Sequence, residues 1–275
     1  MLRKTMAAAL LLGSWSLQAA DFSKADSLFS AREGSLTNTQ AARAAYKELI
    51  ATGLTGADLE RAVVGIARSY TYEGEALTGK VASQDVEKRR DLFRSCWKDT
   101  MPLIAPDKLG YESPAYYYFS AACMAYYAEV SGTLENLANA PTMLRLLEKG
   151  LQSEGGTTYE GGGLNRVKAA VKSNAKAKPL PGGLYNPQEA LTLIDEAIDS
   201  PAYPGSYDGF LFCENYRRKT LVLTELERTS DSLKLAQTSI EDFELYLEIE
   251  EIPAELIPET KHCIDVLQAI VEDLQ

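Results

Sequence analysis

The feature that most constrains the fold is the spacing of apolar residues, which follows steps of three and four along most of the chain. In "GADLERAVVGIARSYTYEGEAL", for example, Leu59, Val63, Ile66 and Ala67 fall on one stripe of a helix. No stretch alternates Val, Ile or Thr with polar residues as a strand would. The chain is therefore predicted to be all-α. The expected helices cover 26–32, 39–51, 56–77, 85–104 with a stop near Pro102, 113–132, 139–152, 186–198, 207–250 as two helices, and 254–275.

The helix expected at 186–198 has a clear start signal. Asn186 is a good N-cap, Pro187 suits the first helical position, and Glu189 can complete a capping box.

Short connections between these helices are typical of helical hairpins stacked side by side. In the tetratricopeptide pattern, a large apolar residue is followed by a small Ala and then by a larger apolar residue four positions on. The residues that match are Leu28, Ala42 and Tyr46 near one end, and Leu223, Ala236 and Ile240 near the other. We predict one domain over 21–275, an all-α fold of tetratricopeptide-like antiparallel helical hairpins stacked into a compact superhelical array.

The first twenty residues, "MLRKTMAAALLLGSWSLQAA", have the order of a secretory signal peptide. Arg3 and Lys4 precede an apolar run from Met6 to Trp15, and the small residues Ala19 and Ala20 follow. The run is too short to span a bilayer, which argues against the alternative of a membrane anchor. We expect cleavage near Ala19 or Ala20 and a soluble protein in the periplasm.

The net charge excludes one class of partner. The chain holds 28 basic and 39 acidic residues, for a formal net charge of −11, and loss of Arg3 and Lys4 with the signal peptide takes it to −13. A protein this acidic has no electrostatic footprint for nucleic acid or for anionic lipid. Nucleic acid is therefore not expected as a partner.

The four cysteines gain significance if the chain is exported, because an even number in an oxidising compartment indicates disulfides. Three pairings are possible among Cys96, Cys123, Cys213 and Cys263. We favour Cys96 with Cys123 and Cys213 with Cys263, since each pair joins segments close in sequence. Buried free thiols are the alternative. No spacing is CxxC, so neither a redox motif nor a zinc motif is indicated.

Candidate catalytic residues are sparse. His262 is the only histidine, so a Ser–His–Asp or Cys–His arrangement could be built only there, and a zinc site would lack a second imidazole. Acidic pairs such as Glu250 and Glu251 alternate with apolar residues and are typical of the solvent-facing side of a helix. We expect no enzyme activity, no metal and no cofactor. A hydrolase with two carboxylates in a polar cleft is the alternative, whereas a binding protein should show an apolar hollow with few perturbed acids.

Aromatic residues cluster in "AYYYFSAACMAYYAEVSG". Tyr116, Phe119, Cys123, Tyr126 and Tyr127 follow one another at steps of three and four, and are expected to share a helix face. One interpretation is core packing between helices. The other is a tyrosine-lined cleft for an apolar or amphipathic ligand, because tyrosine combines an apolar ring with a polar tip.

Three consecutive glycines, Gly161, Gly162 and Gly163, stand in "YEGGGLNRVKAA". A phosphate-binding loop would follow a strand and would carry a Lys followed by Ser or Thr. Lys168 is followed by Ala169, and the residues before the glycines do not read as a strand. The sequence therefore favours an elbow between packed helices over a nucleotide site.

Two segments resemble the T component associated with TRAP transporters (TatT), a family of periplasmic proteins. They are "YYYFSAACMAYYAEVSG" at 116–132, similar to an aromatic helix of that family, and residues 159–190, similar to its glycine loop, the Arg-bearing helix and a "PGG" turn. The resemblance covers most of the mature chain. It implies an all-α array of cryptic tetratricopeptide-like hairpins in which the glycine loop is a bend between helix pairs.

The resemblance also implies a function. Arg166 would tie the turn to a neighbouring helix or face an interior cavity, with Tyr159, Asn165 and Tyr185 as neighbours; a surface salt bridge is the alternative for Arg166. Such proteins are not enzymes. They partner a TRAP-type substrate-binding protein, associate with themselves and enclose a cavity suited to a hydrophobic small ligand. A purely structural periplasmic protein is a third alternative.

Overall fold

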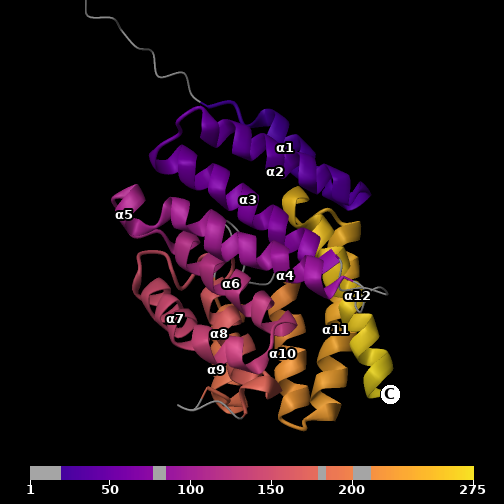
Figure 1. The fold of residues 1–275 in the computed structure, drawn as a ribbon. Coiled ribbons are helices and arrows are strands. Elements are labelled where there is room, and N and C mark those ends of the chain that lie inside the picture. The colour runs from indigo at the N-terminus through magenta and orange to yellow at the C-terminus, as the bar shows by residue number, and fades with distance from the viewer. Residues whose placement is uncertain (1–19, 77–84, 179–183, 201–211) are drawn as a thin grey trace, which may run out of the picture.

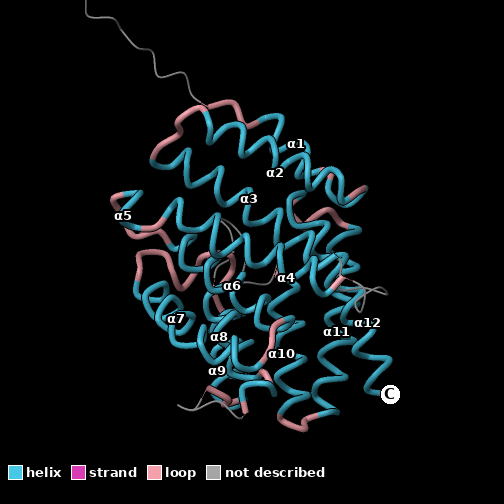
Figure 2. Tube along the Cα trace, in the orientation of Figure 1, coloured by secondary structure: helices cyan, strands magenta, loops and turns pink. Residues whose placement is uncertain are grey.

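The chain folds into a body of packed α-helices, seen in a computed structural model that describes residues 20–76, 85–178, 184–200 and 212–275. No strand occurs within these ranges (Figures 1 and 2). The prediction of an all-α fold is confirmed. The helices are α1 Ser23–Ser30, α2 Leu36–Ala51, α3 Gly56–Ala76, α4 Val86–Arg94, α5 Pro106–Leu109, α6 Pro114–Val130, α7 Thr133–Gln152, α8 Gly163–Ser173, α9 Pro187–Ile198, α10 Cys213–Glu225, α11 Thr229–Glu248 and α12 Ile257–Leu274.

The expected signal peptide lies almost wholly outside the described residues, since the description begins at Ala20. No helix in the described part of the chain combines the length and the apolar character needed to cross a membrane.

One expected helix, 85–104, is interrupted. After α4 the chain forms a π-helical turn at Ser95–Thr100 and a 3₁₀ turn at Met101–Ile104. Pro102 has no N–H to donate to a preceding carbonyl, which prevents a regular helix from continuing through it. The interruption turns Cys96 into the core, where it is fully buried.

The start of α9 follows the pattern predicted from sequence. Asn186 is the N-cap, its side-chain oxygen accepts from the Glu189 N–H at 3.1 Å, and Pro187 occupies the first helical position. The second bond of a capping box, from the Asn186 backbone N–H to the Glu189 side chain, does not form. The Asn186 backbone N–H donates to the Lys172 carbonyl instead, and the Glu189 carboxylate pairs with the Lys172 ammonium at 2.8 Å.

Helices that follow one another in sequence pack together, and the last helix returns to the first (Figure 1). The contact between the ends is made by Arg32, which is 1% exposed. Its guanidinium donates to the Phe29 carbonyl at 2.8 Å, to the Glu255 carbonyl, and to the Glu259 carboxylate. The N-terminal and C-terminal helices thereby enclose the space between them.

Two disulfides, Cys96–Cys123 and Cys213–Cys263, cross-link the helices. The sequence-based pairing is confirmed. The first joins the π-helical turn to α6, and the second joins α10 to α12 across 50 residues of chain. By loop-closure entropy each contributes about 3–4 kcal/mol to the free energy of unfolding.

A buried ion pair fixes α2, α3 and α4 to one another. The Glu73 carboxylate, 2% exposed, pairs with Arg43, accepts from Gln40 Nε2 at 2.8 Å and lies 3.3 Å from Lys88 Nζ. Arg43 in turn lies over the Tyr70 ring. Burial acts to raise the pKa of Glu73, but the hydrogen bonds from Arg43 and Gln40 outweigh it and hold that pKa below its ordinary value.

We expect Glu73→Gln to lower the free energy of unfolding by about 3 kcal/mol near neutral pH, because it leaves the Arg43 charge buried without its partner. The folded-state pKa of Glu73 lies below the unfolded one, so this stabilisation is complete above the unfolded pKa and disappears as pH falls through the folded pKa. Denaturant titrations across acidic pH should therefore show the wild type and the variant converging.

The matched control is Glu48→Gln, which removes the exposed Lys24–Glu48 pair and should change stability by less than about 0.5 kcal/mol. Equal losses for the two variants, or a Glu73→Gln effect that does not shrink in acid, would contradict the assignment.

Candidate functional site

The glycine loop packs tightly against three other segments. A Cβ on Gly161 would lie 2.3 Å from the Phe212 ring, and one on Gly163 would lie 2.6 Å from the Tyr118 ring. Gly162 has a positive φ of +72°, and its Cβ would lie 2.6 Å from the Ala197 backbone in α9. The loop is thus an elbow where backbone and helices pass in close contact.

Arg166 connects this elbow to the rest of the protein. Its Nη1 donates to the Glu160 and Gly161 carbonyls and, at 2.7 Å, to Asn215 Oδ1 in α10, while Nη2 donates to the Tyr118 hydroxyl at 3.2 Å. Asn215 is fully buried, and its Nδ2 donates to the carbonyls of Gly161 and Ala197. The two side chains satisfy loop carbonyls that the close packing hides from water.

Arg166 also lines a chamber at the centre of the helical body. The wall comes from α3, α6, the glycine loop, α8, the start of α10 and the α12 region, and it includes the rings of Tyr118, Phe119, Tyr126 and Phe212. The chamber volume is about 160 Å³. An apolar cavity of about 150 Å³ is enough to hold benzene. The chamber can therefore enclose a small molecule but not a large lipid.

Further hollows adjoin the chamber and share wall residues with it. On one side a groove over α1 and α3 shares Phe29, Arg68 and Glu255 with the chamber. On the other side a smaller compartment between α6, α8 and α10 shares Tyr118, Tyr126 and other residues. We call this smaller hollow the arginine compartment, because Arg166, Arg217 and Arg218 line it. A fourth hollow, beside α7, shares Ala125, Glu129 and Ala170 with that compartment.

Two carboxylates approach each other in the chamber wall around one guanidinium. Arg217 Nη2 forms an ion pair with Glu214 and lies 3.9 Å from Glu75 Oε1. Glu75 also accepts a hydrogen bond from Tyr126. Glu75 belongs to α3 and Glu214 to α10, so only the folded chain brings them together.

The two carboxylates titrate differently. Burial, reinforced by the neighbouring Glu214 charge, raises the pKa of Glu75 above its ordinary value. Burial acts in the same direction on Glu214, but the guanidinium of Arg217, helped by Arg166, outweighs it and holds the pKa of Glu214 below its ordinary value. Opposite shifts of this kind are a feature of acid–base pairs.

The structure brings together only some of the residues predicted from sequence. Phe119, Tyr126 and Arg166 line the chamber. Tyr159 stacks edge-on against Tyr118 and Phe119 and faces the adjoining groove. Asn165 lies behind the chamber wall and donates to Glu196 at 3.2 Å.

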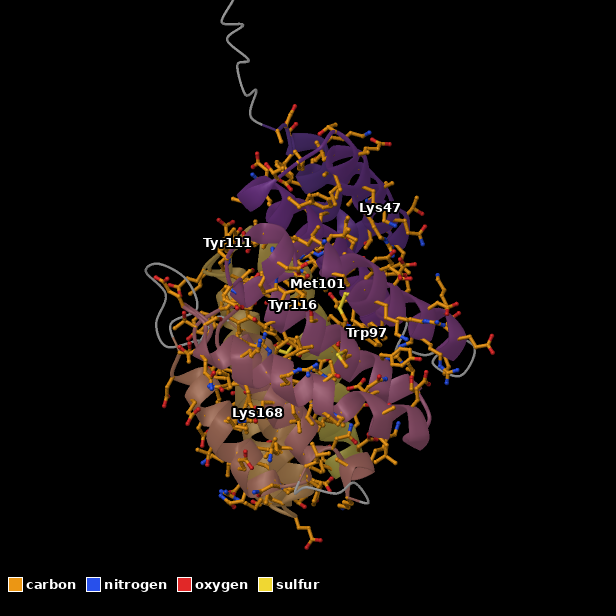
Figure 3. All side chains as sticks on the ribbon, turned by 60° about the vertical axis from the view of Figure 1, so that its left-hand side comes forward. Lys47, Trp97, Met101, Tyr111, Tyr116 and Lys168 are labelled. Atoms are coloured by element: carbon orange, nitrogen blue, oxygen red, sulfur yellow. A yellow bond between two sulfur atoms is a disulfide. The ribbon has the colours of Figure 1, made fainter. Side chains whose placement is uncertain are left out.

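Three of the predicted residues do not line the chamber. Tyr116 and Trp97, both labelled in Figure 3, line a groove that shares none of its wall residues with the chamber. Tyr127 is buried against Trp97 and donates to Glu135. Tyr185 donates to Glu225 beside Lys178. Apolar residues surround α6 on all sides, so spacing alone could not identify which face borders a hollow.

Sequence reasoning missed Tyr118, Glu75 and Glu214 in the chamber wall, and Arg217 and Arg218 in the arginine compartment. The four-residue steps Tyr118, Ala122, Tyr126 were a usable signal, since they define the chamber face of α6. His262 also lines the chamber. Among the described residues no group of three His, Cys, Asp or Glu side chains is placed to hold a metal ion.

We expect Gly162→Ala to destabilise the protein by about 3 kcal/mol, because it adds a clash with Ala197 to the strain of a positive φ. Gly155→Ala is the matched control: its φ is also +72°, but nothing lies within 4 Å of the added Cβ. That variant should lose only about 1 kcal/mol. Urea denaturation measures the free energy of unfolding of both variants. Equal losses would show that the close approach of Ala197 is not a reason for glycine at position 162.

Comparison with known proteins assigns the chain to no family. No protein-family model matches the chain, and the search of curated proteins finds no match. The chamber and its buried charges are therefore the features that bear on function.

Proposed function

We propose that the chain is an exported, non-enzymatic binding protein that holds a small amphipathic ligand in its chamber. The observation that carries this proposal is the chamber itself, whose wall combines the rings of Tyr118, Tyr126 and Phe212 with the charged groups of Glu75, Glu214 and Arg166. Aromatic rings with polar tips suit a ligand that is partly apolar and partly polar.

Between the apolar and the amphipathic ligand considered from sequence, the charged wall favours the amphipathic one. An apolar molecule would exclude water from Glu75, Glu214 and Arg166 without replacing its hydrogen bonds, which is unfavourable for charged groups. The volume sets a second limit. A chamber of about 160 Å³ lies below the range of about 300–1,000 Å³ typical of pockets for drug-sized ligands.

A tetratricopeptide-like arrangement of the hairpins is part of the proposal. Support comes from the close contact of α2 with α3, where a Cβ on Gly65 would lie 2.5 Å from the Tyr46 ring and Ala42 is fully buried. At the other end Ala236 is fully buried and Leu223 nearly so, in the region of α10 and α11. These are the small and large positions that the repeat pattern requires.

Export to the periplasm is also proposed. It is supported by the signal-like first twenty residues and by two disulfides, which persist in oxidising compartments. The resemblance to the TRAP-associated T component supports a periplasmic protein partner, for which a TRAP-type substrate-binding protein is the candidate, and self-association.

We expect Ala122→Leu to abolish ligand binding. Ala122 is 4% exposed and lines both the chamber and the arginine compartment, so three extra carbons would occupy the space of the ligand. Native mass spectrometry of protein purified from its own envelope would measure the bound molecule. The unfolding temperature should stay the same or rise, because the substitution fills a hollow.

The control is Ala138→Leu on the exposed surface of α7, which should keep the ligand. If wild type carries no bound molecule under these conditions, or if Ala122→Leu retains it, the chamber is not a binding site.

A second candidate function is a carboxylate-based hydrolase of envelope polysaccharide, and one observation favours it: Glu75 and Glu214 have pKa values shifted in opposite directions. If this candidate is correct, Glu75→Gln should abolish release of soluble sugars from isolated envelope glycan. Glu272→Gln, an exposed residue on α12, is the control. We expect no sugar release from wild type or either variant, and release by wild type that only Glu75→Gln removes would replace the binding proposal.

A further inference from the structure

The arginine compartment concentrates positive charge in the interior of an acidic protein. Arg166 on α8 and the consecutive Arg217 and Arg218 on α10 all line it. The only carboxylates among its described lining residues are Glu214 and Glu129. Three guanidinium groups thus face two acids within one small hollow.

Both acids compensate this charge only in part. Glu214 is paired with Arg217 through two guanidinium nitrogens. Glu129 is exposed, so water screens its charge. Glu75, in the neighbouring chamber wall, has a pKa raised by burial and by the Glu214 charge, which favours its neutral form. A positive excess therefore remains on the side of Arg218.

Arg218 is the least satisfied of the three. Its Nε atom is buried without a hydrogen-bond partner, and no ion pair of Arg218 is found within the described parts of the chain. Burial and the adjacent Arg217 charge lower the pKa of Arg218. A buried N–H without an acceptor is unfavourable, and a bound anion would supply that acceptor.

We propose that the arginine compartment is an anion subsite, in which Arg218 and its neighbours bind the carboxylate or sulfate-like head of a ligand whose apolar part lies in the chamber. Arginine suits this role, since its planar group donates two parallel hydrogen bonds to such an anion. The shared wall of Tyr118, Ala122 and Tyr126 places the compartment directly beside the aromatic surface. This inference rests on the proposed binding function and adds the charge of the ligand to it.

The experiment uses three probes and the full mature protein. Benzoate carries the proposed anion on a ring small enough for the chamber, benzyl alcohol is its neutral counterpart, and inorganic sulfate tests the subsite without the chamber. Isothermal titration calorimetry measures the dissociation constants. We expect wild type to bind benzoate at least about tenfold more tightly than benzyl alcohol. One hydrogen bond to a charged group changes a dissociation constant by about this factor.

The variant Arg218→Met keeps the length of the side chain and removes its charge. We expect it to bind benzoate about tenfold more weakly and to leave benzyl alcohol binding unchanged. Without ligand it should unfold at a higher temperature, because the buried N–H that lacks an acceptor is gone. Arg94→Met, an exposed arginine on α4, should change none of these values. Ala125→Leu fills the compartment wall without altering charge and should weaken sulfate and benzoate together.

The outcomes separate the two proposals. Binding of benzyl alcohol with no preference for benzoate overturns the anion subsite and leaves the chamber as a binding site. Sulfate binding that Arg218→Met removes supports the subsite even if benzyl alcohol does not bind. Failure of wild type to bind either benzoate or sulfate overturns the subsite. A lower unfolding temperature of Arg218→Met with unchanged benzoate affinity also overturns it, because Arg218 would then be structural.

Discussion

The rest of the structure depends on the buried hydrogen bonds that Arg166 and Asn215 make to the glycine loop. Close packing of this loop against α9, Tyr118 and Phe212 hides its carbonyls from water, and a hidden carbonyl without a donor is unfavourable. Arg166 and Asn215 supply those donors from two different helices. The same bonds therefore fix α8 and α10 relative to α6, and these three helices form the arginine compartment and much of the chamber wall.

Such an interior is unusual for a helical array, because it places several charges where packing would favour apolar side chains. The ion pairs of Arg217 with Glu214 and of Arg43 with Glu73 show how most of these charges are satisfied. Glu73 and Arg43 hold helices together and line none of the hollows described above, whereas Glu214 and Arg217 line hollows. Charges of the second kind can interact with a ligand. The disulfide between Cys213 and Cys263 stabilises α10, the helix that carries Glu214 and Arg217.

Much of the fold could be predicted from sequence, because its causes are local. Helix spacing, the Asn186 cap and the cysteine pairing depend on residues near one another along the chain, and each was correct. The role of the glycine loop as an elbow was also anticipated. The helix expected to stop near Pro102 ends earlier: α4 closes at Arg94, and the turns that follow adopt π and 3₁₀ geometry.

The sequence by itself determined that the chain is helical and where most helices begin and end. Only the tertiary structure decided which face of α6 borders the chamber and which charges share it. The physical reason is that helical periodicity records whether a position is buried but not what it is buried against. Glu75 and Glu214 are far apart in sequence, and only folding buries both side by side. Burial and the Glu214 charge then raise the pKa of Glu75, whereas Arg217 lowers that of Glu214.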